Sequence, residues 1–173
     1  MQINPIIAIS SCLLGEKVRY DGETKRNALI IDTLQDRFEL LPLCPEVAIG
    51  MGVPRAPIQL LKDGSLLRLC EVDQKSCDVT LLMQQHAEEM ARRLSHISGY
   101  IFKARSPSCG LRDTPVFNHA GEILQFGAGL YAGILGRYHP ALPVMDEEMF
   151  MDELQRESFI AQVLTYHQRE LSS

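Results

Sequence analysis

Hydrophobic residues along the chain occur in short apolar runs that alternate with amphipathic stretches. The apolar runs predict short buried strands at 6–10, 38–43, 100–104 and 142–145. Apolar positions that recur with a helical period predict helices at 25–35, 78–98 and 130–138, and a final helix after residue 146. Asp78 and Asp146 stand where an N-cap is expected. Two pairs of apolar segments joined by turn residues, 58–62 with 66–72 and 116–117 with 123–125, are typical of β-hairpins.

Strands that alternate with helices are typical of an α/β protein with a parallel sheet. We therefore expect a three-layer αβα sandwich with a mostly parallel, Rossmann-like sheet. A chain of 173 residues is long enough to bury a substantial core without disulfides. Because no repeat or linker interrupts the pattern, we expect a single domain spanning residues 1–173.

The composition excludes two classes of function. A formal net charge of −5 argues against a general nucleic-acid binder, which would normally have a basic face. No apolar run is long enough to span a bilayer, so no membrane association is expected and the protein is predicted to be cytoplasmic. Structural disulfides are rare in that compartment, and five cysteines cannot all pair within one chain. We therefore expect free thiols.

Three cysteines each follow a predicted buried strand: Cys12, Cys44 and Cys109. The carboxyl ends of parallel strands border the crevice where α/β proteins bind ligands, so these thiols are expected to converge there. Soft thiolates select zinc, copper(I) or iron–sulfur clusters. Three ligands rather than four indicate a reactive site with an open position. Cys70 and Cys77 lie beside a hairpin and a helix start, and we expect them only to pack in the core.

Polar residues beside these cysteines are candidates for chemistry. Glu46 follows Cys44 by two residues, so its carboxylate is expected beside the metal as a general acid or base, unless it is merely a solvated loop residue. Ser106 and Ser108 are expected to donate hydrogen bonds or position water, or else to cap the loop around Pro107.

Other sites built on cysteine or glycine do not fit the sequence. Six residues separate Cys12 from Arg19, one more than a phosphatase-type loop needs, and Tyr20 follows where Ser or Thr is expected. No C-x-x-C pair and no G-x-G-x-x-G fingerprint is present. No histidine adjoins the three cysteines to complete a zinc site, and His86 falls on an apolar helix face typical of a core residue.

Several segments together resemble the thiouracil desulfidase (TudS) family, long catalogued as a bacterial domain of unknown function. The matching segments, in order, are Cys12-Leu13-Leu14-Gly15, Val18-Arg19-Tyr20-Asp21-Gly22, Cys44-Pro45-Glu46, Pro54-Arg55, and Lys103 with Ser106-Pro107-Ser108-Cys109-Gly110. The resemblance extends from about Ile6 to Met145, and the set is specific although each motif alone would be weak.

The resemblance implies a [4Fe-4S] cluster bound by Cys12, Cys44 and Cys109, with one iron left open. It implies that Glu46 and Ser106 form a catalytic pair. The substrate would be a small thiolated pyrimidine or a related thiocarbonyl compound, and the products would be the oxo base and sulfide.

Further residues of these segments are candidates for binding the substrate, although each could equally be structural: Arg19, Asp21, Arg55 and Ser108. An alternative function is a non-catalytic iron–sulfur or zinc-binding module that serves as a sensor or assembly partner, and a zinc enzyme is a third.

Overall fold

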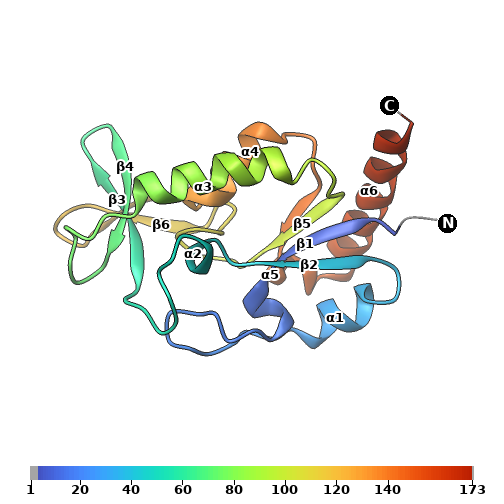
Figure 1. Cartoon of the computed structure of the whole chain (residues 1–173), viewed down its shortest axis with the longest axis horizontal. Helices are drawn as coiled ribbons and strands as arrows, with labels where there is room; N and C mark the ends of the chain where they lie inside the picture. The colour runs from blue at the N-terminus through green and yellow to red at the C-terminus, as the bar shows by residue number, and fades with distance from the viewer. Residues whose placement is uncertain (1–3, 173) are drawn as a thin grey trace.

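The computed structural model describes residues 4–172, which form two four-stranded sheets flanked by helices (Figure 1). Sheet A consists, in spatial order, of β2 (Glu39–Leu43), β1 (Ile6–Ser10), β5 (Gly99–Phe102) and β8 (Val144–Asp146). Sheet B consists of β4 (Leu66–Glu71), β3 (Ile58–Asp63), β6 (Thr114–Phe117) and β7 (Ile123–Gly127). The helices are η1 (Ser11–Leu14, a 3-10 helix), α1 (Ala28–Leu34), α2 (Pro45–Ala48), α3 (Thr80–Arg93), α4 (Leu130–Tyr138), α5 (Glu147–Phe150) and α6 (Glu153–Leu171).

Strand β1 is the buried centre of sheet A and pairs in parallel with β2 on one side and β5 on the other. Its side chains alternate between two apolar clusters, as the period of a strand requires. Ile7 and Ile9 pack in the cluster that contains residues of α1 and α6, whereas Ala8 packs in the cluster that contains residues of α3 and α4. Helices therefore cover both faces of a parallel sheet, which confirms the predicted αβα sandwich.

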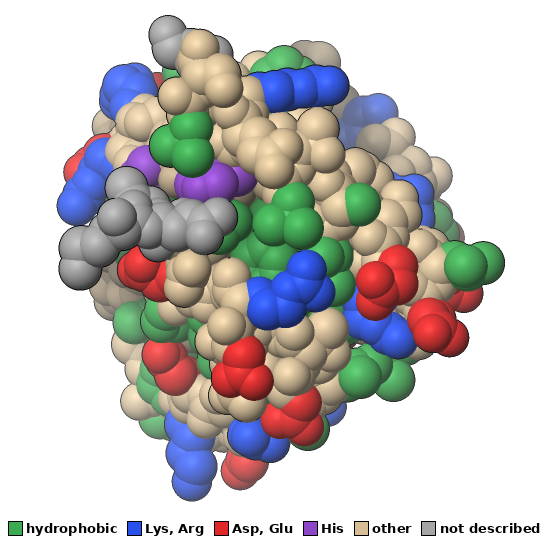
Figure 2. Space-filling view, turned by 90° about the vertical axis from the view of Figure 1, so that its right-hand side faces the viewer, with side chains coloured by type: hydrophobic (Ala, Val, Ile, Leu, Met, Phe, Trp, Pro, Cys, Tyr) green, Lys and Arg blue, Asp and Glu red, His purple; other side chains and the backbone are tan. Residues whose placement is uncertain are grey.

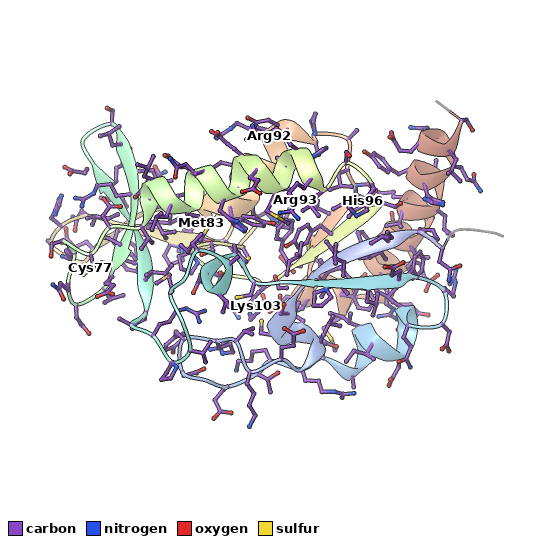
Figure 3. All side chains as sticks on the ribbon, in the orientation of Figure 1. Cys77, Met83, Arg92, Arg93, His96 and Lys103 are labelled. Atoms are coloured by element: carbon purple, nitrogen blue, oxygen red, sulfur yellow. The ribbon has the colours of Figure 1, made fainter. Side chains whose placement is uncertain are left out.

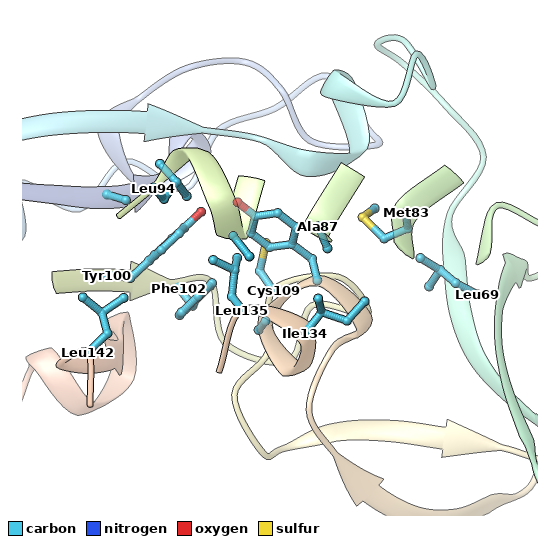
Figure 4. Packing of buried hydrophobic residues seen from close by; sticks show 14 of the residues in the cluster. Leu69, Met83, Ala87, Leu94, Tyr100, Phe102, Cys109, Ile134, Leu135 and Leu142 are labelled. Atoms are coloured by element: carbon cyan, nitrogen blue, oxygen red, sulfur yellow. The ribbon is translucent and has the colours of Figure 1, made fainter. Parts of the chain in front are cut away.

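The side chains of strand β5, which precedes the third cysteine, alternate between the same two apolar clusters. The rings of Tyr100 and Phe102 stack with centroids 3.8 Å apart on the α3–α4 side, while Ile101 packs on the other side. Figure 4 shows Cys109 in this same apolar cluster, close to Leu135 of α4. The core on this face thus extends directly beneath the loop that follows β5.

Sheet B lies at the end of the molecule where α3 begins (Figure 1). The two predicted hairpins are confirmed, because β3 pairs with β4 and β6 pairs with β7 in antiparallel fashion. A parallel pairing of β3 with β6 joins them into one sheet, which the sequence pattern did not predict. Pro42, an unfavourable residue for a central strand, lies in the edge strand β2, where its missing N–H is tolerated.

Helix boundaries differ from the predicted ones where side chains take other partners. Helix α3 begins at Thr80, since Asp78 accepts a hydrogen bond from the Thr80 N–H and also pairs with Arg68 of β4. The predicted final helix is two helices. Asp146 caps α5 as expected, because its carboxylate accepts a hydrogen bond from the Met149 N–H. Asp152 caps α6 in the same way, by accepting a hydrogen bond from the Gln155 N–H.

The face formed around α6 is mixed in character. Figure 2 shows hydrophobic side chains gathered near its centre, with acidic and basic side chains around them. Val144, Met151 and Leu154 are exposed hydrophobic residues of this part of the chain. Within residues 4–172, no helix combines the length and the hydropathy that a membrane crossing requires.

The close approach of α4 to the loop after β5 yields a prediction about stability. A Cβ built at Gly129 would lie 2.5 Å from the carbonyl carbon and oxygen of Ser108 and 2.8 Å from the Cys109 nitrogen. Gly129→Ala is therefore expected to lower the free energy of unfolding by about 1–3 kcal/mol, because backbone must move to admit a methyl group. Urea unfolding of the metal-free protein measures this loss.

Gly136→Ala, in the same helix, is the matched control. Gly136 is exposed and no atom lies within 4 Å of its added Cβ, so alanine should stabilise α4 by about 0.5–1 kcal/mol through its higher helix propensity. If the Gly129→Ala protein had the same urea midpoint as the parent, the close packing of Gly129 against Ser108 and Cys109 would be contradicted.

Candidate functional site

The three predicted cysteines line one cavity of about 370 Å³ at the carboxyl edge of sheet A. Cys12 lies in η1, directly after β1, and Cys44 lies between β2 and α2. Cys109 follows β5 after the six-residue loop segment 103–108, which turns back toward α4. The described chain has only free cysteines at these positions, with Cys12 and Cys109 buried and Cys44 half-buried. The structure therefore brings together thiols from three separate strand ends.

Local hydrogen bonds fix the first cysteine loop. The Cys12 carbonyl accepts hydrogen bonds from the Lys25 N–H at 3.0 Å and from the Thr24 hydroxyl at 2.9 Å. Gly15 ends η1 with a φ of +100°, a left-handed conformation that glycine adopts without strain. The segment from Gly15 to Thr24 is thus tied back to the cysteine and forms one wall of the cavity.

The third cysteine loop is organised by the residue three positions before the thiol. The Ser106 hydroxyl oxygen accepts hydrogen bonds from the N–H groups of Ser108 and Cys109, at 3.3 and 3.1 Å. Its carbonyl accepts from the Gly110 N–H and the Thr114 hydroxyl. Ser106 also lines the cavity, so the residue that shapes this loop borders the space beside Cys109.

Burial makes the three thiols poor acids. Desolvation raises the pKa of Cys12 to about 11, with the nearby Lys103 cation as the main opposing influence. Desolvation also raises the pKa values of Cys44 and Cys109, and for Cys109 the Glu46 carboxylate acts in the same direction. A cationic group that binds all three sulfurs would reverse this preference, because metal coordination deprotonates thiols.

Glu46 lies in α2, one helical turn or less from Cys44, and its carboxylate has defined partners. Arg55 donates a hydrogen bond from Nε to Oε2 at 2.8 Å, and its Nη2 lies 2.7 Å from the same oxygen in an ion pair. Ser108 donates its hydroxyl to Oε1 at 2.8 Å. The side chains of Arg55 and Glu46 are only 6% and 13% exposed, so this ion pair is mostly shielded from water.

A second ion pair supports the opposite side of the cavity. Figure 3 shows Lys103 in the region bounded by α2 and the loop after β1. Its ammonium group binds Glu147 of α5 and the Ala104 carbonyl, and Glu147 also accepts the Ala104 N–H at 2.6 Å. Arg105, the next residue of the loop, pairs with Glu148 at the surface. The cations of this segment are thus held by carboxylates at the end of β8.

The remaining sequence candidates divide into two groups. Arg19 lines the cavity and pairs with Asp21, with Arg19 Nε 3.4 Å from Asp21 Oδ1. Asp21 and Ser108 do not line the cavity, and Ser108 is fully buried. Cys70 is buried in the core of sheet B and Cys77 is half-buried, and neither lines the cavity.

Sequence reasoning gave no role to several residues that surround the cavity. Tyr20, Lys25, Lys103 and Arg105 line it, and Glu147 anchors Lys103. The rule that located the cysteines would have found Glu147, because this residue directly follows β8, the fourth parallel strand.

Comparison with known proteins identifies the family of this chain. The sequence profile of a family described as 2-thiouracil desulfurase matches residues 7–147. Protein YbbK of Bacillus subtilis (strain 168), described as uncharacterized, is 32% identical over an alignment of 111 residues that covers 61% of this chain and 73% of that protein. A solved structure of a [4Fe-4S]-dependent thiouracil desulfidase TudS (DUF523Vcz) is 30% identical and has a TM-score of 0.66, covering 89% of this chain and 98% of that chain. These matches confirm the resemblance that the motifs indicated.

The two neighbouring ion pairs at the end of β8 predict different effects on stability. Glu147→Gln removes the charge that pairs with Lys103 and weakens the hydrogen bond from the Ala104 N–H. The side chains of Glu147 and Lys103 are only 13% and 17% exposed. We expect the free energy of unfolding to fall by about 1–3 kcal/mol. Glu148→Gln is the control, because its pair with Arg105 is 49% and 61% exposed and should contribute at most about 1 kcal/mol. Equal losses in urea unfolding at neutral pH would contradict this difference.

Proposed function

Because the chain belongs to the 2-thiouracil desulfurase family, we propose that it removes sulfur from a small thiolated pyrimidine with the help of a [4Fe-4S] cluster. The observation that carries this proposal is the convergence of Cys12, Cys44 and Cys109 on one cavity. The proposed products are the oxo base and sulfide.

The donor set suits an iron–sulfur cluster. Three thiols line a common cavity, and soft thiolates are the ligands that such clusters use. The similarity to a [4Fe-4S]-dependent thiouracil desulfidase supports the same cofactor. A mononuclear zinc site would instead draw three sulfurs to within roughly 4 Å of one another, because each zinc–sulfur bond is about 2.3 Å.

In this proposal Cys12, Cys44 and Cys109 would hold the cluster, and one of its irons would be left without a protein ligand. When bound, the cluster supplies a Lewis-acidic iron with affinity for the sulfur of a thiocarbonyl group. Water adds its oxygen to the carbon that carries sulfur, the carbon–sulfur bond breaks, and sulfur leaves as hydrogen sulfide with the two protons of the water. No external reductant is needed, since the carbon keeps its oxidation state.

One polar side chain transfers the protons of the water, and a second orients the reactants. The Glu46 carboxylate accepts a proton from the attacking water and returns it toward the departing sulfur. Ser106 orients the water or the pyrimidine ring through its hydroxyl proton, since its oxygen already accepts two backbone N–H groups. Apolar residues of the cavity wall, including Leu43, Pro57 and Ile58, provide the contact surface for a flat heterocycle.

The cofactor and the reaction are tested together by anaerobic reconstitution. We expect the purified protein, loaded with iron and sulfide, to contain close to four irons per chain and to release sulfide from thiouracil. Cys12→Ser, Cys44→Ser and Cys109→Ser should each lose most of the bound iron and all turnover. Cys70→Ala and Cys77→Ala are the controls and should retain the parent's iron content, because neither residue lines the cavity.

The outcomes separate the alternatives. A protein that carries the cluster but leaves thiouracil and thiouridine unchanged would be a non-catalytic iron–sulfur module. A chain that binds one zinc and no iron would be a zinc protein. Loss of iron from Cys77→Ala would show that the ligand set is different.

Glu46→Gln separates chemistry from cluster assembly. The substitution keeps size and hydrogen-bonding capacity but removes proton transfer, so we expect kcat to fall by about 10²–10⁴-fold with unchanged iron content. Steady-state assays of iron-matched parent and variant measure the loss. Parent-like turnover in Glu46→Gln would exclude this carboxylate as the proton carrier.

A further inference from the structure

The two oxygens of the Glu46 carboxylate are used unequally. Arg55 donates a hydrogen bond from Nε to Oε2 at 2.8 Å, and its Nη2 lies 2.7 Å from the same oxygen in the ion pair. Oε1 accepts one bond, from the Ser108 hydroxyl. Within the described residues, Arg55 therefore contacts Oε2 and Ser108 contacts Oε1, so the two oxygens have different partners.

Arg55 is itself fixed on three sides. Its Nη1 donates to the Val18 carbonyl at 2.8 Å and to the Gly52 carbonyl at 3.0 Å. Its backbone N–H donates to the Tyr20 carbonyl at 2.8 Å. The guanidinium thus connects Glu46 to the segment before Tyr20 and to the loop after α2. A lysine ammonium cannot reproduce this pattern, because its donors do not lie in one planar fork.

Ser108 joins the same carboxylate to the third cysteine loop. Its side chain is fully buried, and the residue precedes Cys109 directly. Glu46 in turn lies two residues after Cys44 on α2. The hydrogen bond from Ser108 to Glu46 therefore connects the segment that carries Cys109 with the segment that carries Cys44.

We propose that Arg55 and Ser108 are positioning residues for the Glu46 carboxylate: Arg55 holds Oε2 and Ser108 holds Oε1, so that the carboxylate keeps one orientation beside the cysteines. This inference rests on the proposed desulfidase function. It gives both residues a role that differs from direct substrate binding. Arg55 acts through Glu46, so its loss should slow the chemical step without weakening substrate binding.

The main test compares Arg55 variants that contain equal iron. Arg55→Ala is expected to lower kcat by about 10²-fold, the scale of a misplaced catalytic group, while KM changes less than about threefold. Arg55→Lys should lose nearly as much, since it retains charge without the fork. Added guanidinium chloride at tens of millimolar should restore part of the kcat of Arg55→Ala, with sodium chloride as the ionic-strength control.

Matched variants identify a merely structural effect. Arg68 also pairs with two carboxylates, Asp63 and Asp78, but lies on β4 outside the cavity. Arg68→Ala and Arg68→Lys should leave kcat and KM at the parent's values, and guanidinium should not change their rates. Ser108→Ala should lower kcat by about tenfold at constant KM, because it removes a single neutral donor.

A second readout needs neither cluster nor turnover. In crystal structures of the metal-free Arg55→Ala and Arg55→Lys proteins, the Glu46 side chain should leave the position it has in the parent, while Cys44 and Cys109 stay in place. Soaked guanidinium should occupy the vacated site in Arg55→Ala and restore the Glu46 position.

Several results would overturn the proposal. A raised KM with unchanged kcat would make Arg55 a substrate-binding residue, and loss of iron would make it a support of the cluster. An unmoved Glu46 in the metal-free variants would show that other contacts fix the carboxylate. If the reconstituted parent fails to act on thiouracil or thiouridine, the proposed function fails, and the crystallographic comparison still decides whether Arg55 positions Glu46.

Discussion

Parallel pairing of β1 with both β2 and β5 is the constraint on which the site depends. Ser10 at the end of β1 lies opposite Leu43 at the end of β2, and Ile9 lies opposite Ile101 of β5. Because the three strands end at one level, the segments that follow them begin at the same edge of the sheet. A slip of one residue would turn the buried faces outward, so the two apolar clusters fix this register.

The charged side chains at this edge neutralise one another in ion pairs. Arg55 pairs with Glu46 and Lys103 pairs with Glu147, both largely shielded from water. Lys103 and Glu147 follow different strands, β5 and β8. Arg55 lies in the same connection as Glu46 but also donates to the Val18 carbonyl in the segment after β1, so polar contacts of both pairs connect the loops above the sheet. Removing one member would leave an uncompensated charge, which is costly in a dry environment. The cavity therefore has walls of fixed geometry around thiols that are themselves neutral when metal-free.

The sequence predicted the parts of this arrangement that depend on local pattern. Apolar runs located the strands of sheet A, and their ends located the three cysteines. The short helices η1 and α2 were missed because four residues are too few to show a helical period. The joining of two hairpins into sheet B was missed because the pairing of β3 with β6 links residues far apart in sequence. The ion-pair partners of Arg55 and Lys103 were missed because contacts made by side chains in loops leave no periodic signal in the sequence.

The link between Glu46 and Ser108 shows how the fold couples ligand residues to a neighbouring carboxylate. Each of the two residues lies within two positions of a cysteine, so each moves with its own thiol. Their hydrogen bond, 2.8 Å long, therefore depends on the separation of Cys44 and Cys109. A cofactor that bridges these two thiols would fix that separation, and with it the orientation of the carboxylate. Assembly of the metal site and placement of the proton carrier would then be one event, because the same two loops determine both.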